Sequence, residues 1–176
     1  MVYSFKRNTY TLNKAELKLC WINLIFKNLS VLFCFNSFPE PNDAAMGFTA
    51  YATIYRPYAF EDVVIFDGIV SNFGGNYHTN SSIYICPKSG VYGFGTSIMN
   101  GGSNYYMNIR IMREKSVVVG LQVQRIPDYG NTGATLTVSE CLAGEKIWVL
   151  SSNDDIRLHG DDTRKSVFYG FLLHQY

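Results

Sequence analysis

Short apolar runs alternate with turn-forming clusters along most of this chain. From Tyr105 to Ile111, apolar residues occupy every second position and alternate with Tyr106, Asn108 and Arg110. A period of two predicts a half-buried strand with one set of side chains facing a core. Further runs of strand length are separated by Gly, Asn, Asp or Ser clusters. These runs are Val63–Ile69, Ile83–Cys86, Val91–Met99, Val117–Val123, Ala134–Val138, Ile147–Ser151 and Val167–Leu173.

No apolar stripe with helical spacing interrupts these runs, so the pattern predicts an all-β sandwich or barrel. The composition agrees, because 47% of residues are hydrophobic, 15% are aromatic and only 16% are charged. Such a chain has enough apolar surface to form a core and is not disordered. The formal net charge of +1 supplies no long-range field that would attract phosphates. We therefore expect no nucleic-acid partner.

Six motifs follow one another in a fixed order over about three quarters of the chain. They are Phe48–Tyr51, Ile69–Asn72 with the Tyr77 turn, Cys86–Tyr92, Asn108–Arg113, Gly144–Val149 and Phe168–Leu173. Together they resemble the C1q domain, a branch of the tumour-necrosis-factor-like (TNF-like) jelly rolls, from Met46 to Tyr176. The resemblance implies a ten-stranded jelly-roll β-sandwich of two antiparallel sheets that assembles as a homotrimer. One departure is Gly144-Glu145, where the family usually has Gly-Asp.

We divide the chain into a leader with a linker, residues 1–45, and a C1q-like domain, residues 46–176. Basic residues precede an apolar stretch from Leu19 to Phe35, an order that resembles a secretion signal. Lys27 interrupts this stretch, and a spanning helix needs about 20 apolar residues. We expect a secreted protein without a stable membrane span. A signal anchor at the cell surface, or a leader from a misplaced start of the reading frame, remain the alternatives.

The leader contains no Gly-X-Y repeat, which a collagen stalk would need because only glycine fits the triple-helix axis. The resemblance therefore points to the collagen-less, head-only members of the family. Cys20 and Cys34 lie in the leader, and Cys86 and Cys141 in the domain. The latter two permit one disulfide, but sequence separation does not establish the required Cα distance of about 4.4–6.8 Å. We favour free core thiols, since buried free cysteine is common.

The chain has no motif typical of catalysis, and we predict that it is not an enzyme. His78, His159 and His174 have no neighbours at metal-ligand spacing, and no serine lies in a Gly-x-Ser-x-Gly elbow. Asn80-Ser81-Ser82 is a sequon, which makes Asn80 a candidate glycosylation site.

Calcium is the one candidate cofactor. Heads of the C1q type can bind calcium near the trimer apex, and this cation prefers six to eight oxygen ligands. The candidate ligands here are two adjacent pairs of acids in predicted loops, and Asp128 lies in a third loop. The pairs are Asp154 with Asp155 and Asp161 with Asp162. The alternative is that these acids are merely exposed turn residues.

For the subunit contact, the candidates are surplus aromatic residues, because rings add much buried area at interfaces. They are Tyr51, Tyr55 and Tyr105, with Tyr58 and Tyr106 beside them. For any one of these rings, an ordinary core position is at least as good an interpretation. In the closing strand, Gly170 allows large neighbours to pack closely or another backbone to approach. If the Phe171 ring lies in the core, its replacement by Ala costs about 3–5 kcal/mol.

The function that we infer from the resemblance is recognition by a secreted homotrimer. Its partners would be glycans, microbial surfaces or extracellular proteins, as in the lectin-like C1q-domain proteins of innate immunity. Three weak sites on one rigid trimer bind a repetitive target with raised effective affinity. A trimeric ligand of the cytokine or adipokine type, or an extracellular structural component, are the alternatives.

Overall fold

The computed structural model describes residues 45–102, 106–124 and 130–176, so residues 1–44 of the predicted leader and linker, and Tyr105, lie outside the described residues. Every regular element in these residues is a strand. The strands are β1 (Gly47–Tyr51), β2 (Arg56–Tyr58), β3 (Gly68–Phe73), β4 (Tyr77–His78), β5 (Ile83–Ile85), β6 (Gly90–Met99), β7 (Met107–Arg113), β8 (Ser116–Val123), β9 (Thr132–Cys141), β10 (Lys146–Ser151), β11 (Ile156–Leu158) and β12 (Val167–Gln175).

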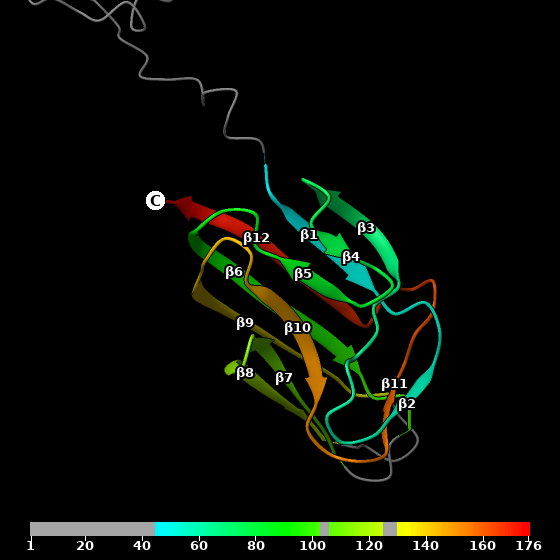
Figure 1. Cartoon of the computed structure of the whole chain (residues 1–176). Helices are drawn as coiled ribbons and strands as arrows, with labels where there is room; N and C mark the ends of the chain where they lie inside the picture. The colour runs from blue at the N-terminus through cyan, green and yellow to red at the C-terminus, as the bar shows by residue number, and fades with distance from the viewer. Residues whose placement is uncertain (1–44, 103–105, 125–129) are drawn as a thin grey trace, which may run out of the picture. The chain divides into compact units, whose positions relative to one another are not determined.

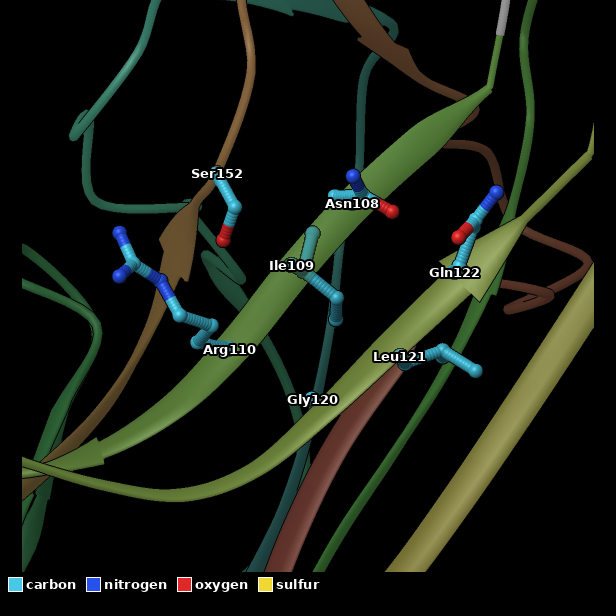
Figure 2. A pocket seen from close by; sticks show the side chains of 7 residues that line it. All are labelled: Asn108, Ile109, Arg110, Gly120, Leu121, Gln122 and Ser152. Carbon is cyan, nitrogen blue, oxygen red and sulfur yellow. The ribbon is translucent and has the colours of Figure 1, made fainter.

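Two five-stranded antiparallel sheets form the domain (Figure 1). The first sheet has the order β3-β1-β12-β6-β9, and the second has the order β4-β5-β10-β7-β8. In the second sheet, β7 pairs with the edge strand β8 (Figure 2). The predicted fold, ten strands in two antiparallel sheets of a jelly roll, is confirmed. A separate two-stranded ribbon, β11-β2, was not predicted.

The core between the sheets is unusually aromatic. Phe48 of the first sheet stacks on Tyr77 and Tyr84 of the second, with ring centroids 4.6 and 4.7 Å apart. The edge of Phe168 meets the same Phe48 ring at 4.9 Å. Aromatic pairs of this kind add stability beyond the area that they bury. Gly170 leaves the space for this packing, since a Cβ there would lie 2.6 Å from a ring carbon of Phe94.

The predicted strand Val63–Ile69 is wrong over most of its length. Val63 makes only an isolated bridge to Leu150, and β3 begins at Gly68. Between them, the N–H of Phe66 donates to the hydroxyl of Ser82 at 2.8 Å instead of to a neighbouring strand. The apolar run marks buried extended chain without a continuous strand partner, because burial alone produces the same sequence pattern.

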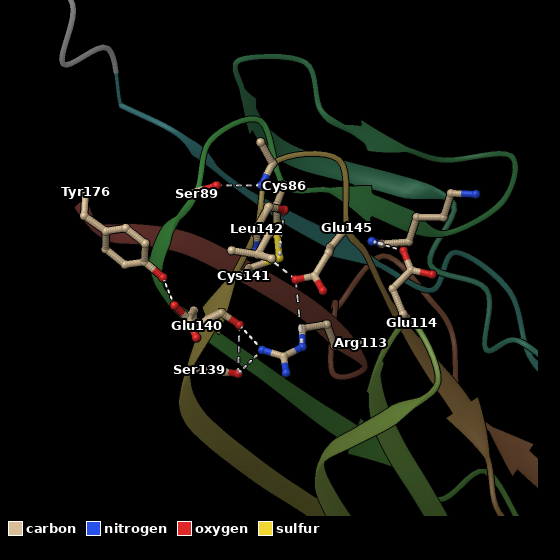
Figure 3. Close-up of polar contacts among 12 residues, drawn as sticks. Cys86, Ser89, Arg113, Glu114, Ser139, Glu140, Cys141, Leu142, Glu145 and Tyr176 are labelled. Atoms are coloured by element: carbon tan, nitrogen blue, oxygen red, sulfur yellow. Dashed lines mark hydrogen bonds and ion pairs between the residues drawn. A yellow bond between two sulfur atoms is a disulfide. The ribbon is translucent and has the colours of Figure 1, made fainter.

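A disulfide joins Cys86 to Cys141 with a Cα–Cα distance of 6.4 Å, so the expectation of free thiols is wrong (Figure 3). Cys86 directly follows β5 of the second sheet, and Cys141 ends β9 of the first. The backbone around the bridge holds the two cysteines close together. The N–H of Cys86 donates to the carbonyl of Glu145 at 2.9 Å, and its carbonyl accepts from Gly144 at 2.8 Å.

Polar side chains reinforce the same junction between the two sheets (Figure 3). Arg113, at the end of β7, donates to the carbonyl of Glu140 on β9. Its guanidinium also lies 3.9 Å from the carboxylate of Glu145. The hydroxyl of Tyr176 donates to the carboxylate of Glu140, a bond that raises the pKa of Tyr176 to about 12. The C-terminal residue is thereby joined to β9.

Candidate functional site: the outer surface of the first sheet

The outer surface of the first sheet displays two rows of apolar side chains across β12, β6 and β9. In one row Tyr169 pairs with Gly95, which pairs with Leu136. In the other row Phe171 pairs with Gly93, which pairs with Val138. We call the surface formed by Tyr169, Phe171, Leu136 and Val138 the aromatic face. Strand alternation places these residues opposite the inward-facing Phe94 and Phe168.

Glycines of β6 set the shape of the aromatic face. A Cβ at Gly95 would lie 2.5 Å from the Tyr169 ring, and one at Gly93 would lie 2.7 Å from the Phe171 ring. Each ring therefore lies across the backbone of the neighbouring strand, which only glycine permits. On the other side of β12, a Cβ at Gly47 would lie 3.0 Å from the Cβ of Phe171. The result is a broad surface in which the rings lie flat against the backbone of the neighbouring strand.

The aromatic face is exposed to a degree that is unusual for apolar residues on one sheet. Leu136 is 57% exposed, Val138 is 61% exposed and Phe171 is 40% exposed. The Phe171 ring thus lies outside the core. The loss of about 3–5 kcal/mol that we expected for its replacement by Ala, if the ring were in the core, therefore does not apply. The six positions in the two rows include no charged residue. Contiguous exposed apolar surface of this kind marks interaction sites.

Tyr51 extends the aromatic face at its β1 margin. It pairs with Val167 of β12, and its ring lies over Gly68, where a Cβ would be 2.4 Å from the ring. The guanidinium carbon of Arg164 lies 4.9 Å from the centre of the same ring, a cation–π distance. Tyr51 therefore lies beside the aromatic face, and its predicted role in a subunit contact stays a prediction.

The other candidate tyrosines do not gather with Tyr51. Tyr58 is buried in the core, and its hydroxyl accepts from the N–H of Ile65 at 3.1 Å. Tyr55 lies against Gly101, in the loop between β1 and β2. Tyr106 is exposed just before β7 of the second sheet, and Tyr105 lies outside the described residues. Composition alone singled out these rings without indicating which sheet surface each one occupies.

The acids proposed for calcium lie on either side of β11. Asp155 pairs with Arg157 at 2.9 Å, and Asp154 accepts from the N–H of Phe60 at 2.9 Å. Asp161 accepts from the N–H of Thr163 and contacts the Nε2 of His159, both at 2.9 Å. Asp162 is exposed. Within the part of the chain that the structure describes, no three His, Cys, Asp or Glu side chains form a group suited to a metal. Asp128 lies outside that part, and calcium binding stays a prediction.

The sequon lies in the turn between β4 and β5. Asn80 is exposed, as attachment of a glycan requires. Ser82 is buried, and its hydroxyl accepts from the N–H of Phe66. The side chain of Asn80 is therefore accessible in the folded domain, while the sequon's hydroxyl has a structural role. Glycosylation of Asn80 stays a prediction.

The chain is similar to known proteins in sequence and in fold. The family model of the C1q domain matches residues 47–173. Caprin-2 of Danio rerio is 27% identical over 122 residues, which are 69% of this chain and 13% of that protein. Human complement C1q tumor necrosis factor-related protein 3 is 27% identical over 112 residues, or 64% of this chain and 45% of that protein. A subcomponent of human complement C1q is 30% identical over 132 residues, or 73% of this chain and 50% of that protein.

The chain thus spans half or less of the length of these relatives. Among solved structures, the globular domain of zebrafish complement 1qA protein superposes with a TM-score of 0.60 at 17% identity, over 74% of this chain and 99% of that one. The Eiger TNF of S. frugiperda superposes with a TM-score of 0.64 at 11% identity, over 76% and 95%. These identities support the shared fold alone.

Proposed function

Because the chain belongs to the C1q domain family, we propose that it is a secreted, homotrimeric recognition protein that binds glycans or microbial surfaces. This is a lectin-like role in innate immunity, and it requires no catalysis. The observation that supports it most is the aromatic face, an uncharged apolar surface on one sheet of a C1q-like domain. Self-association buries such a surface.

The trimer provides the binding mechanism. With the aromatic face of each subunit in the threefold contact, the second sheet and the loops of all three copies face outward. Three weak sites held in one rigid body bind a repetitive surface far more tightly than one site does. Microbial envelopes and glycans present such repeats, whereas a single soluble molecule does not.

Two features support secretion. The disulfide between Cys86 and Cys141 is of a kind that persists in oxidising compartments and is rare in the cytosol. The sequon asparagine, Asn80, is exposed. No helix long and apolar enough to span a bilayer occurs among the residues described in the structure.

The test combines oligomeric state with binding. We expect light scattering to give a mass near three times that of the processed chain. The trimer should then bind whole bacteria or a glycan array, and monomeric protein should not. A monodisperse monomer at micromolar concentration would contradict the proposal.

A second candidate is a trimeric signalling ligand of the cytokine or adipokine type. It is favoured by likeness to a relative whose name includes tumor necrosis factor-related. Saturable nanomolar binding to one cell-surface receptor, independent of glycans, would support it in place of the lectin-like role. Binding to neither kind of target would leave an extracellular structural component.

A further inference from the structure

The two-stranded ribbon of β2 and β11 buries one of its surfaces and exposes the other. Its inward residues are Tyr58, Ile156 and Leu158, each at most 7% exposed. Pro57 and Arg157 pair with each other across the ribbon, and strand alternation directs both to the opposite surface. Figure 1 shows the ribbon at the end of the sandwich away from the C-terminus. The outward surface of the ribbon is therefore separate from the aromatic face.

Tyr55, directly before β2, supplies an aromatic ring to this outward surface. One side of the ring lies against Gly101, where an added Cβ would be 2.6 Å from a ring carbon. The N–H of Gly101 donates to the carbonyl of Arg157 at 2.7 Å, so this glycine lies beside β11. Tyr55 is nevertheless 44% exposed. A ring that is packed on one side and exposed to this degree presents its other side to solvent.

An ion pair fixes the ring and places polar atoms beside it. The Nε of Arg157 donates to Oδ1 of Asp155 at 2.9 Å. The same guanidinium also hydrogen-bonds the hydroxyl of Tyr55. Both charged side chains stay accessible, with 41% of Arg157 and 40% of Asp155 exposed. A ring held in this way loses little conformational entropy when a ligand binds to it.

The chemistry of this surface favours a neutral sugar as the ligand. The C–H groups on one side of a pyranose ring pack against an aromatic ring, which carries partial negative charge on its face. An arginine beside a carboxylate offers both donors and acceptors to adjacent sugar hydroxyls. Since Asp155 compensates the charge of Arg157, a free anion gains little here. A lipid surface is also less suited, because it would desolvate the ion pair.

We propose that Tyr55, Arg157 and Asp155 form a binding site for a neutral hexopyranose, with the Tyr55 ring as the stacking surface. The proposal rests on the recognition role above in one respect, because that role makes glycans the class of target. It gives Tyr55 a role in ligand binding in place of the predicted role in a subunit contact. Three copies of the site on one trimer would engage a repetitive glycan together.

The test is a titration of the whole protein, followed by the NMR shifts of backbone amides. The probes are the methyl glycosides of glucose, galactose and mannose, and cyclohexanol serves as a six-membered ring with a single hydroxyl. EDTA is present throughout, because Asp155 is also a candidate calcium ligand. We expect at least one glycoside to shift the amides of Tyr55, Gly101 and Arg157, and cyclohexanol to shift none of them.

Two variants and a control locate the binding. Y55A should weaken binding of that glycoside at least about tenfold, because the stacking surface is lost. G101A should also weaken it, since the added Cβ displaces the Tyr55 ring without removing it. This second variant tests the site even if Y55A fails to fold. Y106A removes a tyrosine that is 45% exposed just before β7, and it should bind as the unaltered protein does.

Several results would overturn the proposal. They are the absence of shifts with all three glycosides, equal affinity in Y55A, G101A and Y106A, and equal shifts with cyclohexanol. Ile54, beside Tyr55, is 52% exposed. Sedimentation with phosphatidylcholine vesicles in place of sugar binding would therefore identify a lipid-binding surface instead. A loss of the trimer in Y55A would return this ring to the subunit contact.

The titration reads a single site at any oligomeric state, so it separates this proposal from the recognition role. Shifts at the ribbon without binding to bacteria would refute the recognition role alone. Binding to bacteria that Y55A retains, with no shifts at the ribbon, would refute this site alone.

Discussion

Two phenylalanines of β12 differ in their environment because of strand alternation. Phe168 is buried against Phe48 and Phe66, with ring centroids 4.9 and 5.8 Å away. Phe171, an odd number of positions later, lies on the aromatic face and is partly exposed. The same residue type therefore stabilises the fold at one position and is available for assembly at the other.

We expect F168A to lower the free energy of unfolding by about 3–5 kcal/mol, because it leaves a cavity among packed rings. F171A should cost less in the isolated subunit and should act mainly on association. Urea unfolding at several protein concentrations separates the two effects, since only association depends on concentration. A larger, concentration-independent loss for F171A than for F168A would show that the two environments are assigned wrongly.

Asp161, in the loop before β12, makes the stability of the fold depend on pH. Its hydrogen bonds with the Thr163 hydroxyl and with His159 lower the pKa of its carboxyl from 3.8 to about 2. A carboxyl whose pKa is lower in the folded state than in the unfolded chain stabilises the fold when the pH lies above its unfolded-state pKa. That contribution is present above about pH 4 and is lost as the pH falls toward 2.

D161N should remove this part of the acid sensitivity. Thermal unfolding between pH 2 and pH 5 is expected to show a smaller loss of stability with acid than in the unaltered protein. D162N makes the same change of charge at an exposed neighbour and serves as the control. Identical acid profiles for D161N and the unaltered protein would mean that these hydrogen bonds do not persist in solution.

At the scale of elements, the disulfide is the covalent link between the two sheets. It joins the residue after β5 to the end of β9, which are 55 positions apart in the chain. A link of this kind restricts the unfolded chain and typically contributes about 2–5 kcal/mol in small secreted domains.

The double variant C86A/C141A is therefore expected to lose about 2–5 kcal/mol of unfolding free energy, measured in urea. The unaltered protein in a reducing agent should lose a similar amount, which controls for the altered side chains. If neither treatment moved the urea midpoint, the bridge would have no part in stability.

At the scale of the whole molecule, the two sheets present different outer surfaces. The first sheet exposes the uncharged aromatic face, and the second has a shallow hollow whose lining includes the polar residues Asn108 and Gln122. The proposed assembly through the first surface would leave the second one free for a target. The proposed binding to repetitive targets would then depend on assembly.

V138D tests that dependence directly. The side chain at position 138 is 61% exposed, so a carboxylate is tolerated in the isolated subunit, but its burial in a subunit contact is costly. We expect a monomer with an unchanged fold by circular dichroism and with loss of binding to bacteria. V117D makes the same change on β8, where Val117 is 52% exposed, and should remain trimeric. A trimeric V138D would exclude the aromatic face as the contact.

Much of the fold could be predicted from local patterns. The alternating pattern predicted the bounds of β7 to within a few residues, and the apolar runs did the same for β6, β8, β10 and β12. Short strands such as β4 and β11 gave no such signal, because two or three residues are too few for a period. Gly170 was interpreted correctly, because a glycine between aromatic residues of a strand implies close packing.

The candidate site was less predictable, since it depends on which strands are neighbours. Nothing in the sequence pairs Gly95 with both Tyr169 and Leu136, which lie 74 and 41 positions away. The disulfide escaped prediction for the same reason, because sequence separation contains no information about spatial distance. The available signal was the small-aromatic-small order Gly93-Phe94-Gly95, which marks a strand over which outer rings can lie.

By itself, the sequence determined the fold class and the family, because composition, periodicity and motif order are local properties. Only the tertiary structure decided which side of β12 is core and that Cys86 meets Cys141. These are contacts between strands far apart in the chain. The order of strands in a sheet, which creates them, is an outcome of the whole fold.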